Sequence, residues 1–318
     1  MSTNTATELL QAGRSCPIDY TYPPAVLARE PDFAADTLYV VGGLYGNLEA
    51  LEAVEQLAAQ ENARPEIVFN GDFHWVDAEP DWFAAIGRGV ARRRATRGNV
   101  ETEIGRATDI GAGCGCAYPD TFAEDIVQRS NEMLAILRAS IPAPVREPLY
   151  GLPPHLVARV GALRIGIVHG DAGSIAGWGF ARDALDDPGK RTWLADVASA
   201  AKVDVFASTH TGLAALRDFA LPAGRLTIIN NGAAGMPNFA GTGFGVITRI
   251  ATSPSPHTPL YGLQRDKIFI DAIAAHYDRR TFLDRFLKRW PGGSVGHASY
   301  YQRIVSGPDY QIAQAAGR

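Results

Sequence analysis

The chain has 318 residues, of which 46% are hydrophobic and 20% are charged. This balance is typical of a folded globular protein, and it excludes a disordered chain, a collagen-like repeat and a small disulfide scaffold. A net charge of -4 provides no basic surface for nucleic acid, so we expect no nucleic-acid partner.

The cysteines and the first residues indicate the cellular compartment. Cys16, Cys114 and Cys116 are too few for a disulfide framework, and an odd number favours the reducing cytosol. Residues 1–15 lack the apolar stretch preceded by basic residues that marks a signal peptide. No run of about eighteen apolar residues predicts a membrane span. We therefore expect a cytoplasmic protein without a membrane partner.

The first predicted elements are two strand-turn-helix units that follow a proline-rich arm. Residues 1–36 hold their prolines among polar residues, which predicts an irregular N-terminal arm. An apolar strand at 38–41 ends in glycines and is followed by Asn47, which can cap a helix. A second apolar strand at 67–69 ends at Asp72, and another helix follows it. Both units are typical of an α/β protein.

The middle of the chain interrupts this pattern. A glycine-rich loop with Cys114 and Cys116, followed by a polar helix, predicts an insertion at 102–150. A final helix near 281–290 ends at a Pro-Gly pair, and residues 291–318 are expected to form a C-terminal extension. Between the insertion and this helix, strands are expected at 155–168 (two strands), 203–207, 226–229, 243–250 and 267–273.

Polar segments follow the predicted strands at their C-terminal ends. In an open α/β sheet these ends meet in one crevice, so side chains that are far apart in sequence converge there. The candidate ligands in these segments are Asp72, Asn99, His169 and His210. Carboxylate, amide and imidazole donors suit a divalent metal such as Mn, Fe, Zn or Mg. The sequence therefore predicts a metal site at the strand ends.

The order of these segments resembles that of the calcineurin-like metallophosphoesterases over residues 37–290. The matching segments are GGLYGN at 42–47, NGDFH at 70–74, RGNVE at 97–101, HGD at 169–171 and STHT at 208–211. The text GNLEALEAV at 46–54 also looks like the helix entry of the small bacterial members. The resemblance implies one α/β domain, an αββα sandwich of two mixed β-sheets flanked by helices, and phosphoester hydrolysis assisted by bound metal.

Several positions depart from the motifs of the family that the chain resembles. The metal-binding Asp and His of the first motif fall on Gly43 and Tyr45, and the acid that protonates the leaving group falls on Val100. In the last motif, the His that serves the second metal falls on Ser208, whereas the other His falls on His210. We therefore expect about one tightly bound ion, with Mn, Fe or Zn as the expected metals.

Residues beside these motifs could take over the missing roles. His74 lies two residues after Asp72, which makes it a candidate replacement ligand or catalytic general acid. Tyr45 is a candidate tyrosinate ligand of a ferric ion, as the resemblance to purple phosphatases implies. Together with Gly46 and Asn47 it stands at the start of a helix, where backbone N–H groups favour an anion. We predict that these three residues contact the substrate.

The leading functional prediction is a metal-dependent hydrolase of a small phosphoester-like molecule. Two alternatives stay open, namely a non-catalytic protein that binds phosphate or another ligand in the same fold, and a metalloenzyme with different chemistry. A dinucleotide-binding domain is disfavoured, because a G-x-G-x-x-G fingerprint ending at Gly46 would need glycine at Val41. Cys114 and Cys116 are interpreted as structural thiols on the insertion. Nothing in the sequence indicates the oligomeric state.

Overall fold

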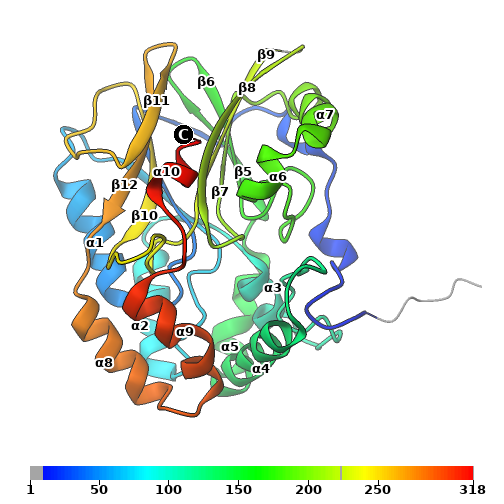
Figure 1. Cartoon of the computed structure of the whole chain (residues 1–318), viewed down its shortest axis with the longest axis vertical. Helices are drawn as coiled ribbons and strands as arrows, with labels where there is room; N and C mark the ends of the chain where they lie inside the picture. The colour runs from blue at the N-terminus through cyan, green and yellow to red at the C-terminus, as the bar shows by residue number, and fades with distance from the viewer. Residues whose placement is uncertain (1–9, 223, 318) are drawn as a thin grey trace, which may run out of the picture.

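Two six-stranded mixed sheets face each other in the computed structural model, which describes residues 10–222 and 224–317 (Figure 1). The first sheet consists of β1 (Phe33–Ala35), β5 (His155–Val160), β6 (Leu163–Val168), β7 (Val205–Ser208), β8 (Ala214–Leu221) and β9 (Gly224–Asn231). The second consists of β2 (Thr37–Val41), β3 (Glu66–Asn70), β4 (Arg94–Thr96), β10 (Gly245–Ala251), β11 (Tyr261–Arg265) and β12 (Ile268–Ala275). Their strand orders are β1-β5-β6-β7-β9-β8 and β11-β12-β10-β2-β3-β4.

Alternating residues of the central strands contribute to two different cores. Leu38 and Val40 of β2 pack between the sheets, whereas Tyr39 and Val41 pack toward the helices. Successive side chains of a strand point to opposite faces. A strand that is buried on both faces therefore reads as a continuous apolar run, which is why β2 could be recognised in the sequence.

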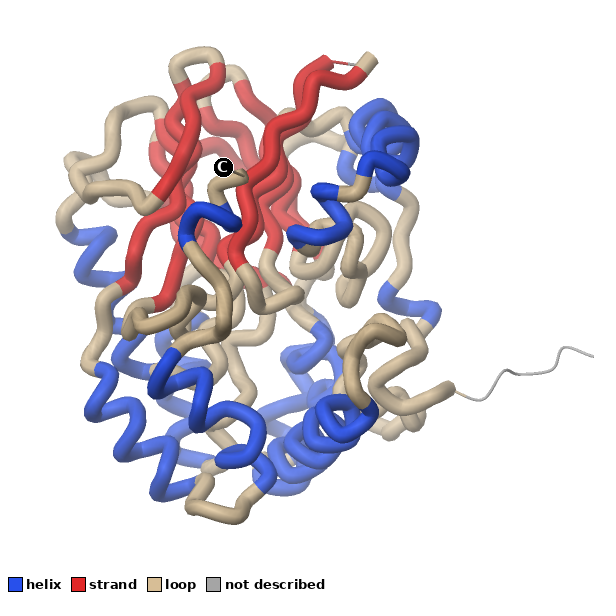
Figure 2. The backbone as a smooth tube through the Cα atoms, viewed as in Figure 1, coloured by secondary structure: helices blue, strands red, loops and turns tan. Residues whose placement is uncertain are grey.

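Helices cover the outer faces of both sheets, and many of them gather at one end of the molecule (Figure 2). They are α1 (Leu48–Ala59), α2 (Pro80–Val90), α3 (Asn99–Gly105), α4 (Glu124–Ser140), α5 (Ala143–Arg146), α6 (Arg182–Asp186), α7 (Arg191–Ala201), α8 (Arg279–Arg289), α9 (Val295–Ser306) and α10 (Ile312–Ala315). Helices α1, α2 and α8 share a core with the β2 sheet, and α7 shares one with the β7 sheet. The predicted αββα sandwich is confirmed. Within the described residues, no helix combines the length and the apolar character that a membrane crossing requires.

The N-terminal segment is more ordered than an irregular arm. Its first nine residues lie outside the described part of the chain. After them come two 3-10 helices, η1 (Ile18–Tyr20) and η2 (Pro24–Leu27), and then β1, which pairs parallel with β5. Strand β1 has only three residues, and none of them is fully buried. The neighbouring strand therefore defines it more than its own sequence does.

Strands β4, β8 and β11 were also not expected from the sequence. Strand β8 carries Arg217 and Asp218 in its middle, which interrupt its apolar run. It is held by antiparallel pairing with β9 along its whole length. Strand β11 contains Gln264 and Arg265 and likewise pairs with β12. These strands are stabilised by their partners, and a search for apolar runs does not find them.

Residues 102–150 and 291–318 both lie against the sandwich. The first segment contains most of α3, then α4, α5 and the 3-10 helix η3 (Glu147–Gly151). The second forms α9, which packs beside α4 and α8, and α10, which lies beside β8 (Figure 1). Between these helices, the Tyr310 hydroxyl donates to the Ala214 carbonyl oxygen at 2.8 Å. This bond ties the C-terminal extension to the edge of the first sheet.

Candidate metal centre

The candidate centre lies where strands of both sheets end. The structure brings together four of the predicted ligands, from four segments: Asp72 after β3, Asn99 at the start of α3, His169 directly after β6 and His210 after β7. A side-chain bond between the two sheets fixes this junction, because Asn70 Nδ2 at the end of β3 donates to the Val168 carbonyl oxygen of β6 at 2.7 Å. We call Asp72, Asn99, His169 and His210 the four-ligand cluster.

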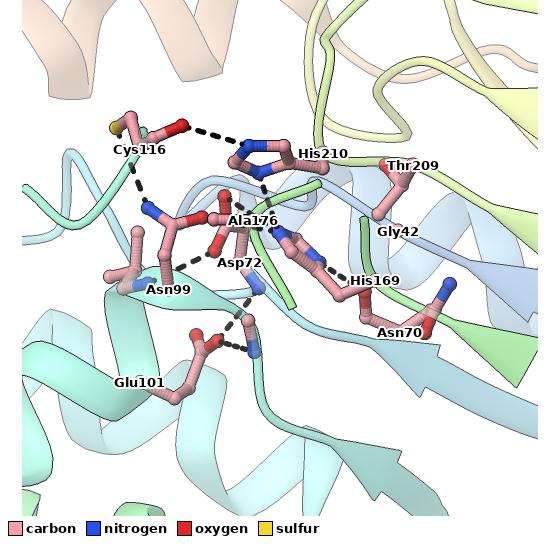
Figure 3. A network of polar contacts seen from close by, with 12 residues as sticks. Gly42, Asn70, Asp72, Asn99, Glu101, Cys116, His169, Ala176, Thr209 and His210 are labelled. Atoms are coloured by element: carbon pink, nitrogen blue, oxygen red, sulfur yellow. Dashed lines mark hydrogen bonds and ion pairs between the residues drawn. The ribbon is translucent and has the colours of Figure 1, made fainter. Parts of the chain in front are cut away.

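The members of the four-ligand cluster are buried, and their polar atoms lie close together (Figure 3). His169 Nε2 lies 3.3 Å from Asn99 Oδ1, 3.4 Å from Asp72 Oδ2 and 3.3 Å from His210 Nδ1. Ligand atoms of Asp72, His169 and His210 all lie within 4.8 Å of one another. Atoms that bind a tetrahedral metal at about 2.0–2.2 Å lie roughly 3.3–3.6 Å apart, so the observed spacing fits a metal ion.

Backbone carbonyls determine which atoms of the cluster face inward. His169 Nδ1 lies 2.8 Å from the Asn70 carbonyl oxygen, and His210 Nε2 lies 3.1 Å from that of Cys116. A carbonyl oxygen only accepts hydrogen bonds, so in the neutral imidazoles both outward nitrogens carry the proton and both inward nitrogens carry a lone pair. Asn99 Nδ2 donates to the Cys114 carbonyl oxygen at 2.9 Å, so Asn99 Oδ1 faces the other ligand atoms of the cluster. Three lone-pair atoms and a carboxylate therefore face one another, an arrangement that calls for a cation.

The electrostatics of the cluster agree with this conclusion. Burial alone lowers the pKa of His169, but the adjacent Asp72 carboxylate outweighs burial and raises it. Burial alone raises the pKa of Asp72, but the His169 imidazole outweighs burial and lowers it. Burial and then repulsion from His169 lower the pKa of His210 to about 3. When no metal is bound, one proton shared between Asp72 and His169 would be the cation of the site.

The backbone at two ligands is held in the left-handed region. Asp72 has a φ of 51° and His210 a φ of 34°, which are uncommon for residues other than glycine. Glu101 supports the first turn, because its carboxylate accepts the backbone N–H groups of Asp72 at 2.7 Å and Gly98 at 2.9 Å. A Cβ atom at Gly98 would lie 2.3 Å from Asp72 Oδ1, so only glycine fits there. Such geometry persists where the surroundings enforce it, as they do here.

The turn at His210 corrects the alignment of the last motif. The resemblance assigned Ser208 to the second metal and treated that ligand as lost. Ser208 is the final residue of β7, whereas His210 lies beside His169 with Asp72 and Asn99 nearby. Because His210 lies in a left-handed turn, its side chain is not placed by the two-residue alternation of a strand. His210 therefore lies in the same cluster as Asp72, Asn99 and His169 and is a candidate fourth ligand.

A cavity of about 140 Å³ opens beside the four-ligand cluster, and Asp72, Asn99 and His210 form part of its lining. Its other side is mostly aromatic. The aromatic residues that line it are Tyr45, Trp75, Tyr118, Phe122, Trp178 and Tyr300. Three of them, Tyr118, Phe122 and Trp178, contact one another with ring centroids 4.9 to 5.8 Å apart, and we call them the aromatic wall. The Trp178 ring also lies edge-on to His210 at 5.3 Å, so the wall adjoins the metal centre.

The structure places His74 outside the four-ligand cluster. Its Nδ1 lies 2.6 Å from Asp77 Oδ2, and its ring stacks on Phe83 with centroids 3.5 Å apart. His74 does not line the cavity. Gly71 and Asp72 both have positive φ, so the chain turns before it reaches His74. The two-residue spacing from Asp72 therefore does not put both side chains on one face, as it would in a strand.

Of the three predicted substrate contacts, Tyr45 lies at the cavity, while Gly46 and Asn47 make hydrogen bonds that support the surrounding structure. Tyr45 lines the cavity, and burial raises the pKa of its hydroxyl well above the usual value, which disfavours a tyrosinate. The Gly46 carbonyl oxygen accepts a hydrogen bond from Trp82 Nε1 at 2.6 Å. Asn47 caps α1, because its Oδ1 accepts the Ala50 N–H at 2.9 Å. Neither Gly46 nor Asn47 lines the cavity.

Sequence reasoning missed two contributions to the site. The glycine-rich loop was expected on a separate insertion, but Cys116 lines the cavity and its carbonyl oxygen accepts from His210 and from Trp178 Nε1 at 2.9 Å. Helix α9 of the C-terminal extension adds Tyr300 and Arg303 to the lining. One sequence signal was available for the loop, since its three alternating glycines all have positive φ and make a compact turn possible. No comparable signal marked α9.

Comparison with known proteins gives a match by structure only. No family model matches the sequence, and no curated protein matches it. The hypothetical protein PH1004 from Pyrococcus horikoshii OT3 superimposes with a TM-score of 0.56 at 15% identity, covering 87% of this chain and 100% of that one. A metallophosphoesterase from Sphaerobacter thermophilus superimposes with a TM-score of 0.52 at 17% identity, covering 86% of this chain and 100% of that one. At such identities the likeness shows the fold, which is that of the metallophosphoesterases, as the sequence motifs predicted.

Proposed function

We propose that the chain is a hydrolase of small phosphoesters that works with one tightly bound divalent ion. The four-ligand cluster would hold the ion. The observation that carries the proposal is a set of buried atoms that face one another: the Asp72 carboxylate, and three lone-pair atoms of His169, His210 and Asn99 that are each oriented by an outward hydrogen bond. Their oxygen and imidazole chemistry suits Mn, Fe or Zn.

When bound, such an ion polarises a phosphoryl oxygen and lowers the pKa of water, which assists attack at phosphorus. The residues of the chain would orient the ester around it. Burial raises the pKa of Tyr45 and of Tyr300, so both hydroxyls keep their protons and can donate hydrogen bonds to phosphoryl oxygens. The aromatic wall would exclude water from the other side of the ester and contact its organic group.

The proposal of a single ion rests on the crowding around Gly43, where the resemblance would put a ligand of another ion. A Cβ atom at Gly43 would lie 3.1 Å from Tyr45 Cε2 and 3.2 Å from Ala233 Cα. Beside it, a Cβ atom at Gly42 would lie 2.3 Å from Thr209 Cβ. Neutral groups thus fill this region, and a longer side chain has no room there. Within the described residues, one group of His, Cys, Asp and Glu side chains has metal-binding geometry.

One observation favours a second candidate function, a binder of phosphate without catalysis. Val100, at the position of the leaving-group acid, is buried, and its backbone N–H donates to Asp72 Oδ1 at 3.2 Å. A valine side chain cannot transfer a proton, and His74 lies outside the cavity. A positioned acid contributes roughly a hundred- to ten-thousandfold, so hydrolysis of alkyl esters should be slow and activated aryl esters should react faster.

The test is elemental analysis of protein purified without added metal, followed by rates on aryl and alkyl phosphomonoesters and phosphodiesters. We expect about one ion per chain and faster turnover of aryl esters than of alkyl esters. Asp72→Ala should lose both the ion and the activity, while His276→Ala, an exposed histidine far from the motifs, should keep both. An ion without hydrolysis of any ester would favour the binder, and no retained ion would refute the metal centre.

A further inference from the structure

Helix α9 places the positively charged side chain of Arg303 at the cavity beside the four-ligand cluster. Arg303 is the one Arg or Lys side chain that lines this cavity in the described part of the chain. Its Nη2 donates to the Gly212 carbonyl oxygen at 2.5 Å. Its Nε is buried and has no hydrogen-bond partner among the described residues. A guanidinium has five N–H donors, so most of its capacity is unused.

The buried arginines of the described chain are paired with acids, whereas Arg303 is half-buried. Arg249 bonds to Glu61 through two nitrogens, at 2.6 and 3.0 Å. Arg106 forms salt bridges with Asp19 and with Glu103. Within the described part of the chain, Arg303 forms no salt bridge of this kind. Half-buried arginines elsewhere, such as Arg97 and Arg138, also lack an acidic partner, but each donates to two carbonyl oxygens. Arg303 donates to one, so its guanidinium keeps donors for an anion at the cavity.

Packing fixes the position of α9. Gly296 lies so close to Trp290 that a Cβ atom would meet the indole ring at 2.3 Å. The same indole donates from Nε1 to the Val76 carbonyl oxygen at 2.8 Å, which ties the start of α9 to the segment that follows Asp72. Tyr300 packs edge-on against Trp75 with centroids 6.5 Å apart. The packing of α9 therefore fixes the position of Arg303 beside the cavity.

The charges that face the cavity indicate the class of anion. Among the described residues of the lining, Asp72 is the only carboxylate and contributes one negative charge, and Arg303 contributes one positive charge. A divalent ion in the four-ligand cluster would leave the lining with a positive charge of about two. A phosphomonoester carries about 1.5 to 2 negative charges at pH 7, which matches this lining better than the single charge of a diester.

We propose that Arg303 binds the phosphoryl group of the substrate opposite the metal centre, and that the substrate class is phosphomonoesters with a small organic group held by the aromatic wall. This inference rests on the function proposed above for the same site. Arg303 donates two N–H groups to the phosphoryl oxygens that face away from the ion. Trp178 and Phe122 lie against the ester group.

The experiment measures the affinity for inorganic phosphate by calorimetry, on metal-stripped protein and on protein loaded with the ion that elemental analysis identifies. Arg303→Met should weaken phosphate binding about ten- to hundredfold in both states, because a charge-assisted pair of hydrogen bonds is lost. Arg303→Lys, which keeps the charge, should lie between Arg303→Met and the parent. The control is Arg279→Met, which removes an exposed arginine that contacts the same helix through the Val305 carbonyl oxygen.

A second measurement compares phosphomonoesters with phosphodiesters. Arg303→Met should raise KM for monoesters about tenfold and leave KM for diesters nearly unchanged. Phosphate binding by Arg303→Met and Arg303→Lys that equals that of Arg279→Met would overturn the inference, as would a parent protein that does not bind phosphate. Loss of the metal from a folded Arg303→Met variant would also overturn it, since Arg303 would then act only by holding the Gly212 loop near His210. Failure of the parent to retain metal would refute the proposed function instead, while phosphate binding to the stripped protein would still decide the role of Arg303.

Discussion

The two sides of the cavity are built by different parts of the molecule. The four-ligand cluster belongs to the sandwich itself, and each of its members follows a strand or begins the next helix. Much of the opposite side comes from segments added to the sandwich, namely the glycine-rich loop with Tyr118 and Phe122 of the aromatic wall and helix α9 with Arg303, whereas Trp178 comes from the connection between β6 and α6. The first side is polar and its atoms are oriented by backbone carbonyls, whereas the second is mostly aromatic.

This difference separates the groups that would carry chemistry from those that would select a substrate. Strand ends can place ligand atoms accurately because the sheets fix their backbones. Added segments can change length and composition without disturbing the sheets, so they suit the recognition of a particular ester. Substitutions on the first side should therefore remove the metal, and those on the second side should leave it bound.

The largest expected effect is on the sandwich side. His169→Ala removes the imidazole that lies within 3.4 Å of the other three ligand atoms, so metal affinity should fall at least about 100-fold. Elemental analysis after dialysis measures this loss. His155→Ala, which removes a half-buried histidine of β5 outside the cavity, is the matched control. A His169→Ala protein that retains its ion would show that the metal is held elsewhere.

His74 should affect stability and not metal content. His74→Ala removes a ring that stacks on Phe83 and leaves the buried Asp77 carboxylate without its imidazole partner. The free energy of unfolding should therefore fall by about 3 kcal/mol. Urea unfolding measures the change, and elemental analysis should give the parent value for the folded protein. If metal content falls while stability is unchanged, His74 is a ligand after all.

The smallest effect is expected on the added side, at the glycine-rich loop. His210 and Trp178 contact the carbonyl oxygen of Cys116, and its thiol contacts the four-ligand cluster only by accepting from Asn99 Nδ2 at 3.5 Å, a role that a serine hydroxyl can also fill. Cys116→Ser should therefore change metal affinity by less than about twofold and stability by about 1 kcal/mol or less. Cys114→Ser should behave in the same way with respect to metal. Loss of the ion from Cys116→Ser would make the thiol a ligand and would end the distinction between the two sides.

The parts of the molecule that could be predicted are those whose structure is determined by residues close to them in the sequence. Strands β2, β3, β6 and β7 are buried on both faces, so they appear as apolar runs, and polar ligands follow them. This relation placed Asp72, His169 and His210 at strand ends, whereas Asn99 follows the short strand β4 and was identified by its motif. The αββα sandwich was expected from the resemblance of these motifs.

Other features have causes that lie far away in the chain. Strand β8 exists because β9 pairs with it, and Arg303 reaches the cavity because α9 packs beside α4 and α8. His74 faces the core because the chain turns at Asp72 with a left-handed φ. Neither apolar periodicity nor motif spacing contains this information, which explains why the added side of the cavity was not foreseen.

The order of the cavity-lining segments in the chain has a consequence for biosynthesis. A ribosome releases the chain from its N-terminus, so Asp72, Asn99, His169 and His210 emerge before α9. Until Arg303 has been synthesised, the cavity lacks one of its walls and the strand ends stay open to solvent. The four-ligand cluster of the nascent sandwich would therefore be open to a metal ion, and α9, which is made after all members of the cluster, would cover it afterwards.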